Sequence, residues 1–191
     1  MIGRRLLPVP LVLAAVLAVG CGDERTATVA SEGHGTDTEH SASAGSGEHG
    51  GAGLEGLYAS IGKDVKTAPG SPKTSGEPPA ELVKHDVVEG KGAAAKVGDD
   101  VEVQYQLTVW GADGQVVDSS WQRGQPATFP LQSGGLIEGW IQGVPGMKVG
   151  GRRILVVPPD LGYGPAGQPP AIPANATLVF VIDLVGTGKG G

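Results

Sequence analysis

Residues 177–185 read TLVFVIDLV, and this stretch decides how the rest of the chain must be arranged. After Thr177, Asp183 alone interrupts the apolar run. Since β-branched and aromatic side chains favour extended backbone, the stretch predicts a β-strand. Nearly every position is apolar, so the strand is expected at the centre of a sheet.

The segment before this strand is rich in proline, with six prolines between residues 158 and 173. Proline removes a backbone hydrogen-bond donor, so this segment cannot form the core of a sheet or helix. We expect a stiff lip that ends where the strand begins, and whose prolines reduce the entropy lost when it orders.

Further strands are predicted upstream of this loop. Apolar and polar residues alternate over 101–109, which indicates a strand with one buried face. Asp113-Gly114 predicts a hairpin turn, after which residues 115–118 return. The remaining strands are predicted at 82–88, as an edge strand, and at 128–131 and 152–157.

Only one helix is predicted in this region, over residues 136–144, which read LIEGWIQGV and are followed by Pro145. Many antiparallel strands and one short helix predict an α+β domain in which a bent sheet packs over the helix. The folded domain is expected over residues 81–191.

The N-terminus has the pattern of an export signal. Arg4 and Arg5 precede an apolar run, residues 6–20, that is too short to span a membrane. The run ends in LAVGC, which resembles a bacterial lipobox, although Ala18 stands where leucine is usual. We therefore predict a signal peptide over residues 1–21 and lipidation of Cys21, which would anchor the chain to the extracytoplasmic face of the cell membrane. Secretion with cleavage nearby and an uncleaved anchor are the alternatives.

Residues 22–80 are rich in Gly, Ser, Ala, Thr and Pro, a composition that predicts a disordered tether. Apolar residues at helical spacing over 54–65 indicate a marginal helix that forms only against a surface, because Gly56 and Gly62 oppose it. Three histidines in the tether are read as solvated, with metal binding as the alternative; they are His34, His40 and His49.

Several classes of function are excluded by the sequence. The net charge is −6 and basic stripes are absent, so nucleic acid is not an expected partner. Residues 162–167 fit G-x-G-x-x-G, but the prolines that follow prevent the helix that a dinucleotide site requires. Ser119 and Ser120 lack a nearby base, since His85 is the only histidine of the domain. No cofactor or metal is therefore predicted.

What remains is a set of apolar and aromatic residues with few polar partners. Some of these residues must form the core, but an apolar concavity with a few aimed hydrogen bonds also describes a ligand pocket. Trp140 and Tyr163 favour the pocket, because each carries a polar group that needs a partner when buried.

Five motifs in residues 81–186 resemble the FKBP-type peptidyl-prolyl isomerases. They are VVDSSWQRGQPATFPL, GLIEGW, GVPGMKVGGRR, PPDLGYG and IPANATLVF, and they occur in the order of the family. The resemblance implies an antiparallel sheet of five or six strands that wraps around the short helix. It also implies a prolyl pocket with Trp140 as its floor, and hydrogen-bond donors at the Tyr163 hydroxyl and the Ile137 N–H. It assigns catalytic positions to Tyr105, Asp118, Trp140, Tyr163 and Phe180, and substrate-binding positions to Val117, Arg123, Phe129, Leu136, Ile137 and Ile172.

Four positions depart from the family pattern. Val117 and Ala127 stand where aromatic residues are usual, and Gln168 and Ala171 replace a histidine and a larger aliphatic residue. The pocket is therefore expected to be less aromatic and to bind macrolide immunosuppressants weakly.

The resemblance implies a monomeric isomerase that acts on X-Pro bonds of unfolded or partly folded proteins. With the predicted export signal, exported proteins are the expected substrates. The alternative is a catalytically weak module, or holdase chaperone, that grips proline-containing segments.

Overall fold

The structure, a computed structural model, describes residues 51–190, and for residues 51 and 52 it describes the backbone alone. The predicted signal peptide, Cys21 and the three histidines of the tether lie outside the described residues. Within the described part, the helices are α1 (Gly51–Ser60), α2 (Ser120–Arg123) and α3 (Glu138–Gly143), with short 3-10 turns η1 (Pro159–Leu161) and η2 (Gly164–Ala166). The strands are β1 (Val83–Val88), β2 (Asp99–Val109), β3 (Val116–Ser119), β4 (Ala127–Pro130), β5 (Arg152–Val157) and β6 (Leu178–Lys189).

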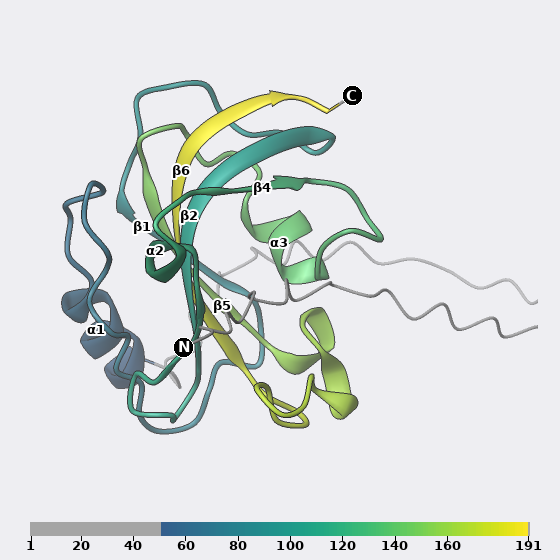
Figure 1. Cartoon of the computed structure of the whole chain (residues 1–191). Coiled ribbons are helices and arrows are strands. Elements are labelled where there is room, and N and C mark those ends of the chain that lie inside the picture. Colours follow the sequence, from purple (N-terminus) through teal and green to yellow (C-terminus); the bar gives the residue numbers. More distant parts are fainter. Residues whose placement is uncertain (1–50, 191) are drawn as a thin grey trace, which may run out of the picture.

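The strands form one six-stranded antiparallel sheet in the order β1-β5-β6-β2-β3, with β4 paired to β2. The sheet curves around α3, and α1 lies on its opposite side (Figure 1). β6 runs between β5 and β2, and β1 is at the edge, so both predicted positions are confirmed. The predicted α+β architecture is confirmed as well.

The apolar run of β6 is explained by burial of both faces of the sheet. Leu178, Phe180 and Ile182 join the core cluster on the side of α3. Val179 and Val181 alternate with them and join a second buried cluster on the side of α1. A strand covered on both faces needs apolar side chains at successive positions, whereas a strand with one wet face alternates.

Two glycines allow α3 to approach β5 closely. A Cβ atom at Gly139 would lie 2.4 Å from Val157, and one at Gly143 would lie 2.7 Å from Leu155. The helix is shorter than predicted, because Ile137 keeps an extended backbone (ψ 147°) and the helix begins only at Glu138. The single turn of α2 was not predicted; it ends at Gly124, whose φ of 74° suits glycine.

The prediction of a tether over residues 22–80 is wrong for its second half. Residues 51–60 form α1, and Leu57 and Ile61 are 0% and 4% exposed against the sheet. The composition of the segment predicted disorder because it takes account only of the apolar residues within the segment. The sheet adds an apolar face, and burial of that face offsets the entropy lost when the segment becomes ordered. The expected helix forms against a surface, but it ends at Ser60, two residues before Gly62. We call residues 53–76 the strap.

In the part of the chain that the structure describes, no helix combines the length and apolarity needed to cross a bilayer.

Candidate active site

The predicted site is built around Trp140, which α3 places in the concave side of the sheet. Three rings meet the indole edge to face: Tyr105 of β2 at 5.9 Å between centroids, Phe129 of β4 at 5.3 Å and Phe180 of β6 at 5.4 Å. Trp140 is 3% exposed, Phe180 5% and Tyr105 8%. Edge-to-face pairs are favoured by the aromatic quadrupole, so the cluster fixes the indole in one orientation.

A polar group adjoins this aromatic cluster. The Tyr105 hydroxyl donates a hydrogen bond to Asp118 of β3. Arg123, at the end of α2, donates from Nη1 to Asp118 Oδ1 at 2.5 Å and from Nη2 to the Tyr105 hydroxyl oxygen at 2.8 Å. The Tyr105 hydroxyl therefore uses both its proton and its oxygen within the protein, which orients its ring against Trp140.

The surroundings keep both tyrosines of the site protonated. Burial, followed by the hydrogen bond to Asp118, raises the pKa of Tyr105 to about 12. Burial and the charge of Asp118 also raise the pKa of Tyr163 above its usual value. Tyr163 packs against the same core cluster as Tyr105 and Trp140. A protonated phenol at this position is a hydrogen-bond donor at neutral pH.

Tyr163 and the residues before α3 form the less buried part of the site. Val117, Leu136, Ile137 and Tyr163 are half-buried and pack against the core cluster that contains Trp140. The Ile137 N–H precedes the first turn of α3 and donates to no acceptor within residues 51–190. This N–H is therefore free to bind a carbonyl, as the family resemblance implies.

Ile172 is 1% exposed and belongs to the core cluster that contains Trp140. Its backbone exchanges two hydrogen bonds with Gln168, at 2.8 and 3.0 Å, which close the proline-rich loop on itself. The loop contains a cis peptide bond between Pro169 and Pro170, and Tyr163 lies between its two 3-10 turns. The predicted stiff lip next to the last strand thus takes the form of a closed loop that presents Tyr163.

Ser120 is a structural residue that sequence reasoning did not assign to the site. Its buried hydroxyl accepts the Tyr105 N–H at 2.7 Å and donates to Gln104 Oε1 at 2.5 Å. It thereby ties the start of α2, two residues after Asp118, to the strand that carries Tyr105. The turn of helix that it begins is too short to show a periodic pattern, so the sequence gives little signal for this role.

One open hollow of about 470 Å³ lies away from these residues. It is bordered by Glu81, Lys84, Gln142, Asp160 and Leu161 among others, and contains none of the predicted site residues. Among the described residues there is also no group of three or more His, Cys, Asp or Glu side chains placed to hold a metal ion.

The aromatic cluster around Trp140 can bind a small apolar ring. The Ile137 N–H and the Tyr163 hydroxyl can donate hydrogen bonds to the peptide backbone on either side of that ring. These features fit the prolyl pocket that the family resemblance implies. Residues 91–185 match the family model of the FKBP-type peptidyl-prolyl cis-trans isomerases.

Relatives of known class agree with this match. The chain is 50% identical over 110 residues to a probable FK506-binding protein of Corynebacterium glutamicum, covering 58% of this chain and 90% of the relative. It is 46% identical over 104 residues to the FKBP-type peptidyl-prolyl cis-trans isomerase FkpA of Escherichia coli, covering 54% of this chain and 37% of FkpA. The crystal structure of AtFKBP13 superposes with a TM-score of 0.52 at 35% identity, covering 58% of this chain and 96% of that one.

The chain therefore belongs to the FKBP-type peptidyl-prolyl cis-trans isomerase family, and it is a peptidyl-prolyl cis-trans isomerase.

Proposed function

We propose that this isomerase acts on X-Pro bonds of exported or cell-envelope proteins and assists their folding. The observation that carries the proposed chemistry is the Trp140 aromatic cluster beside the paired Tyr105, Asp118 and Arg123 side chains. The assignment to the envelope is supported by the signal-like pattern of residues 1–21.

The reaction needs no proton transfer. Rotation about an amide bond has a barrier of about 18–20 kcal/mol because the planar form is stabilised by resonance. The planar form also carries more charge separation than the twisted form, so water favours it. An apolar site that replaces water around the prolyl amide lowers the barrier, and closer fit to the twisted form adds differential binding.

The residues divide this work in a simple way. The prolyl ring packs on the face of the site formed by Trp140 and its aromatic neighbours. The Ile137 N–H and the Tyr163 hydroxyl bind carbonyls of the substrate chain on either side of the ring. Asp118 and Arg123 stay paired with Tyr105 and hold the wall of the site in place.

Export gives such an enzyme a natural supply of substrates. Uncatalysed X-Pro isomerisation takes tens to hundreds of seconds and can limit folding. Newly exported chains emerge unfolded, so their prolyl bonds are accessible. In this proposal Cys21 carries the lipid, and residues 22–50 remain as the tether, since the strap belongs to the domain. A coil of that length has a root-mean-square span of about 30 Å.

Two measurements test this proposal. The rate of cis-trans exchange of an X-Pro peptide, added to the full chain, should rise above the rate in buffer and should fall on Trp140→Ala. Fatty-acid labelling in a bacterial host, followed by fractionation, should place the chain in the membrane, and Cys21→Ser should abolish both label and membrane association. A catalytically active but unlabelled, soluble chain would contradict the anchor and leave the isomerase standing.

The second candidate function is a weakly catalytic module that holds proline-containing segments. It is favoured by Val117 and Ala127, which are half-buried at the wall of the site and give less aromatic surface than the family usually has. The same two residues predict weak binding of FK506-type macrolides. In this proposal the domain acts as a monomer. Peptide binding in calorimetry with an exchange rate equal to that in buffer would favour this module over the isomerase.

A further inference from the structure

The strap gives this domain a second layer that the matched family region does not contain. Residues 53–76 precede the family match, which begins at residue 91. They cover the face of the sheet opposite α3, where Leu57 and Ile61 meet Ile154, Val156 and Val181. The strap is therefore a feature of this chain whose function has to be sought in its own contacts.

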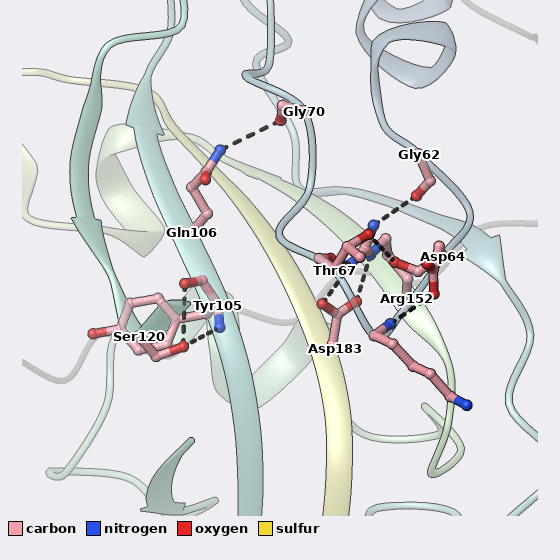
Figure 2. A network of polar contacts seen from close by, with 10 residues as sticks. Gly62, Asp64, Thr67, Gly70, Tyr105, Gln106, Ser120, Arg152 and Asp183 are labelled. Atoms are coloured by element: carbon pink, nitrogen blue, oxygen red, sulfur yellow. Dashed lines mark hydrogen bonds and ion pairs between the residues drawn. The ribbon is translucent and has the colours of Figure 1, made fainter. Parts of the chain in front are cut away.

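The middle of the strap is held by a buried ion pair (Figure 2). Arg152 is 0% exposed and binds both carboxylate oxygens of Asp183, from Nε at 2.5 Å and from Nη2 at 2.8 Å. Its remaining contacts go to the strap: Nη1 donates to the Gly62 carbonyl at 2.7 Å, and Nη2 to the Thr67 carbonyl at 2.8 Å. Since a buried guanidinium needs partners for its N–H groups, the strap carbonyls complete this site.

The C-terminal end of the strap is held against the hairpin turn between β2 and β3. The Thr74 hydroxyl accepts the Gly111 N–H at 2.8 Å, and the Trp110 indole donates to the Gly76 carbonyl at 3.0 Å. Gly114, at the tip of the turn, packs so closely on the strap that an added Cβ would lie 3.0 Å from the Ser71 side chain. Between these two attachment points, Gln106 of β2 donates to the Gly70 carbonyl, while the ring of Tyr105 points away from the strap (Figure 2).

The position of the hairpin affects the prolyl site, because the hairpin leads directly into β3, which forms one wall of that site. β3 begins two residues after Gly114 and carries Val117 and Asp118. It is the terminal strand of the sheet path, and it pairs with β2 through a short register that shifts between Leu107 and Thr108. A short edge strand with an irregular register is weakly held by its ladder, so contacts at its turn have a large share in fixing its position.

We propose that the strap is a brace for the prolyl site, and that Thr74 and Trp110 are positioning residues that hold the β2–β3 hairpin and with it Val117 and Asp118. The inference rests on the prolyl site described above. Val117 and Asp118 form a wall that meets the substrate in both its planar and its twisted form. Loosening of this wall therefore weakens substrate binding and leaves the turnover rate unchanged.

The test uses the full chain with substitutions at the hairpin end of the strap. Thr74→Val keeps the shape of the side chain and removes the acceptor for the Gly111 N–H, whereas Thr74→Ser keeps the hydroxyl. We expect KM for an X-Pro peptide to rise at least threefold in Thr74→Val, with kcat within twofold of the wild type and KM restored in Thr74→Ser. Trp110→Phe, which removes the indole donor, should also raise KM. The dissociation constant of the same peptide should rise in parallel, so the test does not depend on turnover.

Two controls separate bracing from a general loss of stability. Met147→Ala removes a side chain that is 2% exposed in the core on the side of α3, away from the strap, and should lower the melting temperature without raising KM. Hydrogen exchange of the Gly111 amide should quicken in Thr74→Val and not in Met147→Ala.

The proposal is overturned if peptide affinity in Thr74→Val equals that of the wild type while the Gly111 amide has become exchangeable. It is overturned as well if Met147→Ala raises KM as much as Thr74→Val, or if exchange of the Gly111 amide is insensitive to Thr74. Loss of turnover in the wild type with intact peptide binding would reject the isomerase and still leave the brace testable through affinity.

Discussion

Replacement of Trp140 by alanine tests the core of the mechanism. The indole is 3% exposed and touches Tyr105, Phe129 and Phe180. If the prolyl ring packs on this cluster, the substitution withdraws apolar contact from three ring methylene groups. At about 0.8 kcal/mol each, the loss is about 2.4 kcal/mol. With about 1.36 kcal/mol per tenfold change in rate, kcat/KM should fall about 60-fold.

The substitution also costs stability, and the experiment must separate the two effects. Removal of a buried Trp side chain typically lowers the free energy of unfolding by about 3–5 kcal/mol. Leu155→Ala offers a matched control, because Leu155 is 0% exposed in the same core cluster, lies on β5 against Gly143, and costs about 2–5 kcal/mol. Both variants should be assayed by peptide exchange at low temperature, with the folded fraction measured by urea titration.

The expected result is a large loss of kcat/KM per folded molecule in Trp140→Ala and a change of less than threefold in Leu155→Ala. Equal activity losses in the two variants would show that catalysis follows core stability alone. Wild-type activity in folded Trp140→Ala would refute the assignment of the indole as the floor of the site.

Three further outcomes follow from the same geometry. Tyr163→Phe removes one donor to a substrate carbonyl, worth about 1 kcal/mol, and should lower kcat/KM about fivefold in the peptide assay. Because the folded pKa of Tyr105 is about 12 against 10.0 when unperturbed, the folded chain retains a proton between these values that the unfolded chain has lost. The free energy of unfolding should therefore fall by roughly 3 kcal/mol as the pH rises from below 10 to above 12, and urea titrations of Tyr105→Phe should lack this component. Val117→Phe adds an aromatic wall and should tighten binding of a macrolide about two- to tenfold in calorimetry; unchanged affinity would mean that Val117 does not face the ligand.

The sheet could be predicted from the sequence because its strands obey simple periodicities. Residues 101–109 alternate as a strand with one face in the main core, and the apolar run of residues 178–185 marked the centre of the sheet. The site residues came from the resemblance to the family and not from periodicity. The structure brings Tyr105, Phe129, Trp140 and Phe180 into one cluster from four separate elements, a proximity that no local pattern encodes.

The strap could not be predicted because its order depends on a partner surface far away in the sequence. Its own composition is that of a linker, and the contacts that fix it join residues more than thirty positions apart, such as Thr74 with Gly111 and Gly62 with Arg152. A local window contains neither partner. The one local signal, the helical spacing of residues 54–65, correctly indicated a helix that needs a surface. The sequence did not identify the sheet face that provides this surface.

The sheet nevertheless carried indirect signs of a second layer. Val179 and Val181 are as apolar as the residues that face α3, which is costly unless both faces of β6 are covered. Asp183 is the polar residue in the apolar run of β6, and it pairs with Arg152 of β5 under the strap. Arg153, which follows Arg152 on β5, points to the other face of the sheet. There Arg153 binds Asp86 through both carboxylate oxygens, at 2.7 and 2.8 Å, and the Gly143 carbonyl at the end of α3.

Two consecutive arginines of β5 thus fasten α3 on one face and the strap on the other. Buried ion pairs add little net stability, but one that is completed by strap carbonyls specifies where the strap must lie. If the strap braces the prolyl site as proposed, the functional unit of this isomerase begins near residue 53, and not at residue 81, where the sequence predicts the start of the domain.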